Sequence, residues 1–174
     1  LAAILYAKPI QDSWQSSRAE QMIREAGGIP SFKGYPGPQH PVPFPGSICA
    51  SPDSMVVHGI PDRRPLDEGS IISIDVGVTL DGWVADAAFT FPVGQVDPVA
   101  EKLLATTRQS LDDAVAACQV GGRLGDVSNA VQTTVEAAGF AVVRTLVGHG
   151  VGREMHEDPQ IPNYGPAGKG PRLE

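Results

Sequence analysis

The sequence is poor in several kinds of residue, and each scarcity excludes a class of protein. It has two cysteines among 174 residues, Cys49 and Cys118, and they form no CxxC pair. A disulfide framework and a cysteine zinc site are therefore both disfavoured, and a reducing cytosol is the simpler expectation. No apolar run approaches the roughly 20 residues that cross a bilayer, and the opening LAAILYAKPI has no basic leader or cleavage pattern. We therefore expect a cytoplasmic protein with no membrane partner.

Basic residues are also in the minority. The chain has 13 lysines and arginines against 20 aspartates and glutamates, which gives a formal net charge of -7. No basic stripe is present, so the sequence argues against a nucleic-acid partner. Hydrophobic residues make up 41% of the chain, and its length suits one ordinary domain. We expect residues 1–52 to form a helix and a wrapping loop, and residues 53–174 to form the body of that single domain.

The most informative stretch is residues 71–91, IISIDVGVTLDGWVADAAFTF. Two runs rich in β-branched and aromatic residues flank Asp81-Gly82, a dipeptide that is typical of a two-residue hairpin turn. If this turn forms, Leu80 pairs with Trp83. The stretch therefore predicts two long antiparallel strands in a fixed register.

This register brings two carboxylates together. Asp75 lies opposite Ala88, so Asp86 becomes its diagonal neighbour on the same face, with backbones roughly 6 to 8 Å apart. Two adjacent carboxylates repel one another unless one is protonated or a cation binds to them. Oxygen ligands on neighbouring strands suit one hard divalent ion or a pair about 3.5 to 4 Å apart. The spacing alone leaves open that one aspartate is a solvated residue on an outward face.

Other patterns predict the order of helices and strands. Residues 17–26 predict a helix that two glycines end, and the proline-rich residues 30–52 predict an ordered loop with apolar anchors. Asp97-Pro98 is typical of a helix start. A second helix is predicted from near Asp126, and a buried strand is predicted from Phe140 onward. This order indicates an α+β fold with an antiparallel component.

Three of the four histidines, His58, His149 and His156, lie in two glycine-containing motifs. These are VVHGIPD at 56–62 and GHGVGREMHEDP at 148–159. Glycine neighbours let a ligand approach His149 closely, and imidazole is a common ligand of borderline metals. His149 is therefore a candidate third ligand beside the aspartates, and an ordinary structural histidine is the alternative.

Taken in order, VVHGIPD, IISIDVG, GWVADAAFTF and GHGVGREMHEDP resemble the type I methionine aminopeptidases. The loop PSFKGYPGPQHPVPFPGSICAS is also similar to the proline-rich wall before that family's first histidine motif. The resemblance implies the pita-bread (creatinase/aminopeptidase) fold, an antiparallel sheet with helices packed on one side, with residues 53–174 as the catalytic domain. It implies a cytoplasmic metallo-hydrolase that removes the initiator methionine from nascent proteins and prefers a small second residue. A contact with the ribosome is implied only by that role.

Carried over residue by residue, the resemblance implies a metal site, two catalytic residues and a substrate pocket. The metal ligands are Asp75, Asp86 and His149, for two divalent ions of cobalt, manganese, iron or zinc. His58 and His156 match histidines that contact the substrate and stabilise the reacting amide. The positions near the family's pocket for the methionine side chain are matched by four aromatic residues, Tyr35, Phe44, Trp83 and Phe32. Ordinary core packing is the alternative interpretation of these residues.

The resemblance is incomplete at the C-terminal end. The family has two further ligands, glutamates on later strands, and Glu174 matches a turn before the first of them. We therefore expect the C-terminal half of the sheet to be incomplete and the chain as it stands to be a poor catalyst. Ala85 and Ala87 stand where many relatives have glycine and threonine, which bears on metal preference.

Three other interpretations compete with this one. A protein-binding module of the same fold is disfavoured, because such proteins usually lose ligands individually and every ligand position that the chain covers is intact. A catalytically inactive fragment of the enzyme stays open. A related proline-specific metallopeptidase would share the metal site, but VVHGIPD together with GREMHEDP fits the methionine class better. A mononuclear iron site with His58 and Asp62 lacks a third ligand nearby.

Overall fold

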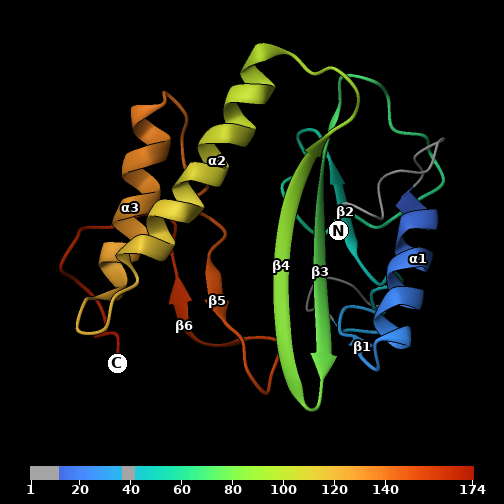
Figure 1. Ribbon diagram of the computed structural model, residues 1–174, viewed down its shortest axis with the longest axis horizontal. Helices are drawn as coiled ribbons and strands as arrows, with labels where there is room; N and C mark the ends of the chain where they lie inside the picture. Colours follow the sequence, from blue (N-terminus) through green and yellow to red (C-terminus); the bar gives the residue numbers. More distant parts are fainter. Residues whose placement is uncertain (1–11, 37–41) are drawn as a thin grey trace. The chain divides into compact units, whose positions relative to one another are not determined.

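The computed structural model describes residues 12–36 and 42–174 (Figure 1). Residues 1–11 and 37–41 belong to the region 1–52 for which a helix and a wrapping loop are predicted, and they lie outside the described part. By their internal contacts the residues form two compact units. The first runs up to Asp97 and includes Val151–Met155, and the second comprises Pro98–Gly150 and His156–Glu174. None of the helices in the described ranges is long and apolar enough to cross a membrane.

The first unit is built on a sheet of four antiparallel strands. Its long hairpin consists of β3 (Ile71–Leu80) and β4 (Trp83–Pro92), which Figure 1 shows in green. Two short strands, β1 (Ile29–Pro30) and β2 (Cys49–Pro52), pair with different stretches of β3. The sheet therefore joins the segments on both sides of the proline-rich loop to the hairpin.

The predicted hairpin register is confirmed, with Leu80 opposite Trp83 and Asp75 opposite Ala88. Asp81 and Gly82 have φ angles of 51° and 76°. Two consecutive residues in this left-handed region make the turn whose twist matches that of the flanking strands. The Asp-Gly dipeptide thus fixes which residues of the two strands meet.

One face of this sheet carries the apolar core. Ile72 and Ile74 of β3 are buried and pack with Ile48, with Ala50 of β2 and with Ala19 of helix α1. Helix α1 spans Asp12–Glu25, which confirms the helix predicted at 17–26 and extends it toward the N-terminus. The helix covers this face because its apolar positions replace water over the even-numbered side chains of β3.

The second unit contains two helices and a small hairpin of strands. Helix α2 (Pro98–Ala117) begins at the predicted Asp97-Pro98 start. Helix α3 (Leu124–Ala137) begins slightly before the predicted Asp126, whose side chain accepts a hydrogen bond of 2.8 Å from the amide of Arg123. Strands β5 (Gly148–Gly150) and β6 (Glu157–Ile161) pair antiparallel. The α+β class with antiparallel sheets is confirmed.

The strand predicted from Phe140 onward is wrong for most of its length. Residues 140–147 form no strand, and Val143 and Leu146 are 41% and 40% exposed. Strand propensity describes side chains that pack on a pleated surface, but the backbone also needs a partner for its hydrogen bonds. That pairing begins only at Gly148, which lies opposite Ile161 of β6.

The buried face of β3 gives a direct test of the core. Ile74 is 1% exposed, so Ile74→Ala should lower the free energy of unfolding by about 2–5 kcal/mol, since it leaves a cavity. Ile29→Ala is the control, because Ile29 is 59% exposed and its loss should cost less than about 1 kcal/mol. Urea denaturation of both variants measures the difference. Equal losses would contradict the placement of the core.

Candidate metal and substrate site

The face of the sheet opposite α1 carries the two aspartates. Asp75 of β3 pairs with Cys49 of β2, and Asp86 of β4 pairs with Gly77 of β3. Residues that oppose each other across strands point to the same side, and side chains along a strand alternate. Asp75, Gly77 and Asp86 therefore share one face, which we call the aspartate face. The predicted diagonal relation of the two aspartates follows from this register.

The two carboxyl groups interact strongly. Burial, followed by the charge of Asp86 and a hydrogen bond that protonated Asp75 donates to the side chain of Asp86, raises the pKa of Asp75 to about 7. A hydrogen bond from the backbone of Val76 acts in the opposite direction. The pair therefore holds a proton up to near-neutral pH, because two adjacent negative charges away from water are unfavourable. A divalent cation would relieve the same repulsion, so this pair of hard oxygen donors fits a metal ion.

An apolar cluster lies on the aspartate face. Phe32, Cys49 and Met155 are buried in it, and Phe44 and Val84 pack against them. The predicted pocket residues Phe32 and Phe44 are thus brought together. The sequence analysis missed Cys49 and Met155, although Met155 directly precedes the predicted His156.

Two small details explain how this cluster sits beside the carboxylates. A Cβ atom at Gly77 would lie 2.6 Å from Cε1 of Phe32, so only glycine lets this ring rest on the strand. Burial, and then the charges of Asp75 and Asp86, raises the pKa of the Cys49 thiol to about 12. Cys49 therefore stays a neutral thiol and serves as an apolar wall, not as a nucleophile.

The other two predicted pocket residues lie outside this cluster. The Tyr35 side chain is exposed, while its carbonyl accepts a hydrogen bond of 3.0 Å from the amide of Phe44 and so closes the loop. Trp83 begins β4, and alternation from Asp86 points it to the other face. The guanidinium of Arg153 lies 3.8 Å from the centre of the Trp83 ring. The structure thus gives Trp83 a stacking partner and Tyr35 a backbone role.

His58 is held in the first unit by an unusual turn. Its φ angle is 60°, a conformation that few residues other than glycine adopt, and its side chain is exposed. The following Gly59 accepts a hydrogen bond of 2.9 Å from the amide of Ala50 and donates one of 3.0 Å to the hydroxyl of Ser51. A Cβ atom at Gly59 would lie 1.9 Å from the carbonyl oxygen of Ala50. These contacts of Gly59 fix the backbone beside His58 to strand β2.

His149 and His156 come together in the second unit. Their ring centroids are 4.3 Å apart, with planes inclined at 38°. Nδ1 of His149 lies 2.9 Å from the carbonyl oxygen of Gly150. A carbonyl only accepts hydrogen bonds, so Nδ1 carries a proton, and in the neutral ring the lone pair is then on Nε2. This is the tautomer that a metal ligand requires.

Within residues 12–36 and 42–174, no three His, Cys, Asp or Glu side chains form a cluster that could hold a metal ion. Asp75 and Asp86 belong to the first unit, whereas His149 belongs to the second. The carboxylate pair is therefore the part of the predicted ligand set that one unit assembles by itself.

The sequence as a whole has a recognisable family. Residues 10–174 match metallopeptidase family M24. The chain belongs to this family. Membership implies a metal-dependent protein, which agrees with the donor chemistry of the aspartate face. It also confirms the expected pita-bread fold, because solved structures of the family superimpose on nearly the whole chain.

Two of the relatives that the chain resembles are methionine aminopeptidases. A methionine aminopeptidase 1 from Bacillus subtilis is 52% identical over 155 residues, which cover 89% of this chain and 60% of that protein. The crystal structure of a methionine aminopeptidase from Thermotoga maritima shares 42% identity at a TM-score of 0.88, covering 94% of this chain and 64% of the other. A prolidase from Pyrococcus horikoshii, 16% identical with a TM-score of 0.74, shares the fold alone. The chain thus spans about 60% of the length of curated relatives such as this one.

The raised pKa of Asp75 predicts how stability depends on pH in metal-free protein. A carboxyl whose folded pKa lies above its unfolded value favours the folded state at low pH, and this contribution is lost as pH rises toward 7. Asp75→Asn removes the ionisation, so the variant should gain stability relative to the parent between pH 5 and pH 8. Urea denaturation at both pH values, with a chelator present, measures this gain.

A matched control separates this effect from a general change of charge. Arg64 holds the pKa of Asp62 below its usual range, so Asp62 is ionised throughout the same pH interval. Asp62→Asn should therefore change stability equally at pH 5 and pH 8. A gain for Asp75→Asn that is the same at both pH values would contradict the raised pKa.

Proposed function

We propose that the chain carries the aspartate half of a methionine aminopeptidase, which removes the N-terminal methionine of nascent proteins and peptides in the cytoplasm. The observation that carries the proposal is the carboxylate pair of Asp75 and Asp86 beside an apolar cluster on one face of the sheet. A cation at the carboxylate pair would bind the free amino group of a peptide. The apolar cluster would bind the side chain of the first residue of that peptide. The high identity to methionine aminopeptidases supports this choice of substrate.

The proposed metal ligands are Asp75, Asp86 and His149, and they would hold two divalent ions of cobalt, manganese, iron or zinc. Such ions, when bound, polarise the scissile carbonyl and supply hydroxide near neutral pH. The residues fit this role because the carboxylates are hard oxygen donors and His149 keeps its Nε2 lone pair. The relatives extend beyond the part that this chain matches, so their remaining length is available for further ligands.

The chain's own residues would bind and orient the peptide. Phe32, Phe44 and Met155 belong to an apolar cluster whose chemistry would suit the long unbranched side chain of methionine. Tyr35 would border this pocket from outside the cluster, whereas Trp83, which points to the other face of the sheet, would not. A preference for a small second residue follows from the resemblance to methionine aminopeptidases. Contact with the ribosome follows only from the proposed role on nascent chains.

The two remaining histidines would act on the peptide bond itself. His156 would donate a hydrogen bond to the carbonyl oxygen as negative charge develops there. His58 would help to position the amide nitrogen, and its locked turn suits this role because a fixed backbone restricts the imidazole. Each role requires a side chain that reaches substrate, and both histidines are exposed in their units.

The metal proposal predicts the behaviour of two single variants. Asp75→Asn and Asp86→Asn each remove a ligand, so each should weaken Mn²⁺ or Co²⁺ binding by more than the roughly 10–100-fold that follows loss of an outer partner. Calorimetric titration of the metal into chelator-treated protein measures this loss. Asp62→Asn is the control and should bind as the parent does. Unchanged affinity in both ligand variants would exclude the aspartate face as the metal site.

The activity itself is tested by methionine release from Met-Ala-Ser with added Mn²⁺ or Co²⁺. Intact mass comes first, because a mass above 18.2 kDa identifies a chain longer than the sequence given. We expect a longer chain to release methionine and to release nothing from Ile-Ala-Ser, whose branched side chain fits the pocket poorly. We expect little release from a chain of 18.2 kDa. Cleavage of a peptide with proline in second place, but not of Met-Ala-Ser, would favour the proline-specific alternative. Metal binding without any release would favour an inactive fragment or a binding module.

A further inference from the structure

The proline-rich loop reaches the aspartate face with two arms, which we define as residues 31–35 and 44–49. The arms carry three members of the apolar cluster, namely Phe32, Phe44 and Cys49. Backbone hydrogen bonds of 2.8 and 3.0 Å, both made by Phe44, join one arm to the other. The relative position of the arms therefore determines how Phe32, Phe44 and Cys49 lie against one another.

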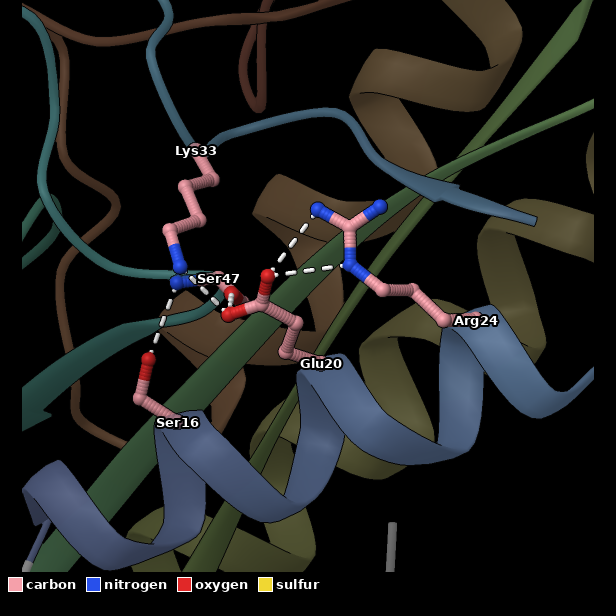
Figure 2. A network of polar contacts seen from close by, with 5 residues as sticks. All are labelled: Ser16, Glu20, Arg24, Lys33 and Ser47. Carbon is pink, nitrogen blue, oxygen red and sulfur yellow. Dashed lines mark hydrogen bonds and ion pairs between the residues drawn. The ribbon is translucent and has the colours of Figure 1, made fainter.

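One carboxylate on α1 binds both arms (Figure 2). The ammonium of Lys33 donates to Oε2 of Glu20 at 2.5 Å, and the hydroxyl of Ser47 donates to the same oxygen at 3.2 Å. Nε of Arg24 donates to Oε1 at 3.0 Å and holds the carboxylate from the helix side. The hydroxyl of Ser16 accepts a further bond of 2.9 Å from the amide of Ser47. Helix α1 thus binds the first arm at Lys33 and the second arm at Ser47.

Burial decides which of these contacts matters most. The side chains of Lys33 and Arg24 are 45% and 55% exposed, so water screens their ion pairs and each adds little alone. Ser47 is 1% exposed. A buried hydroxyl needs an acceptor, and Glu20 supplies it. Removal of Glu20 would therefore take one contact from the first arm and leave a buried donor in the second.

Glu20 binds two residues, Lys33 and Ser47, that lie close in sequence to members of the apolar cluster. Lys33 directly follows Phe32, and Ser47 lies two residues before Cys49, which pairs with Asp75. Glu20 belongs to the helix on the other face of the sheet and is not a member of the cluster. The hydrogen bonds that Glu20 makes outside its own helix go to the two arms, so the arms are its direct link to the aspartate face.

We propose that Glu20 is a positioning residue that fixes the spacing of the two arms, and so sets which N-terminal side chain fits beside Asp75 and Asp86. The positioning itself stands on the contacts above, whereas its effect on substrate choice rests on the proposed function. Two measurements on the same variants keep these claims separate.

The first measurement is the rate at which N-ethylmaleimide labels Cys49, followed by mass spectrometry of the chain. Cys49 is buried and Cys118 is exposed, so Cys118 is the internal reference for reagent and pH. Glu20→Ala should raise the Cys49 rate relative to Cys118 by about five- to tenfold, because a charge-assisted contact and a buried hydroxyl lose their partner. Glu20→Gln keeps an acceptor oxygen and should restore most of the protection.

Two controls separate positioning from a loss of overall stability. Glu25→Ala removes an exposed carboxylate from the same helix and should leave the Cys49 rate unchanged. Ile23→Val weakens the packing of the helix without touching the network, and its Cys49 rate should rise only in proportion to its change in unfolding equilibrium. The proposal is overturned if Glu20→Ala leaves the rate unchanged, or raises it no more than Ile23→Val does at equal stability.

The second measurement compares Met-Ala-Ser with Leu-Ala-Ser in the presence of Mn²⁺. Glu20→Ala should lower the ratio of their kcat/KM values at least about fivefold, mainly through a higher KM for the methionine peptide, because a looser wall gives up fit in the pocket. An unchanged ratio, with faster labelling of Cys49, would overturn the claim on substrate choice and keep the positioning. If the parent chain releases no methionine, the proposed function fails, and the labelling result still decides the role of Glu20.

Discussion

Alternation along a single pair of strands is the constraint on which the first unit depends. Because successive side chains of β3 point to opposite faces, Ile72 and Ile74 enter the core while Asp75 faces the other way. A shift of one residue in the pairing would place a carboxylate in the core and an isoleucine on the aspartate face. The left-handed turn at Asp81 and Gly82 fixes the register, and it therefore secures the core and the carboxylate pair at once.

The parts of the structure that local chemistry decides could be predicted from the sequence. The Asp-Gly turn determines the pairing of the two residues beside it, and every later pair along the hairpin follows by counting. The start of α2 is equally local, since aspartate caps a helix and proline suits its first turn. In both cases the deciding residues lie within a few positions of the feature that they determine.

The parts that distant contacts decide could not be predicted in this way. The run after Phe140 has the composition of a strand, but a strand also needs a partner, and that information lies elsewhere in the chain. The apolar cluster on the aspartate face is a similar case. Cys49 enters it because β2 pairs with β3, and Met155 enters it from a segment far along the sequence. The motif resemblance identified Phe32 and Phe44, but it gave no signal for the residues that complete their surroundings.

The turn at His58 affects how the role of this residue can be studied at all. Histidine, asparagine and aspartate tolerate a left-handed backbone better than alanine does. An alanine substitution would therefore remove the imidazole and strain the turn in one step, so that a lost activity would have two explanations. Asparagine removes the imidazole and keeps a residue that suits a φ angle of 60°. At this position the conformation of the main chain, and not the size of the side chain, determines which replacement is the conservative one.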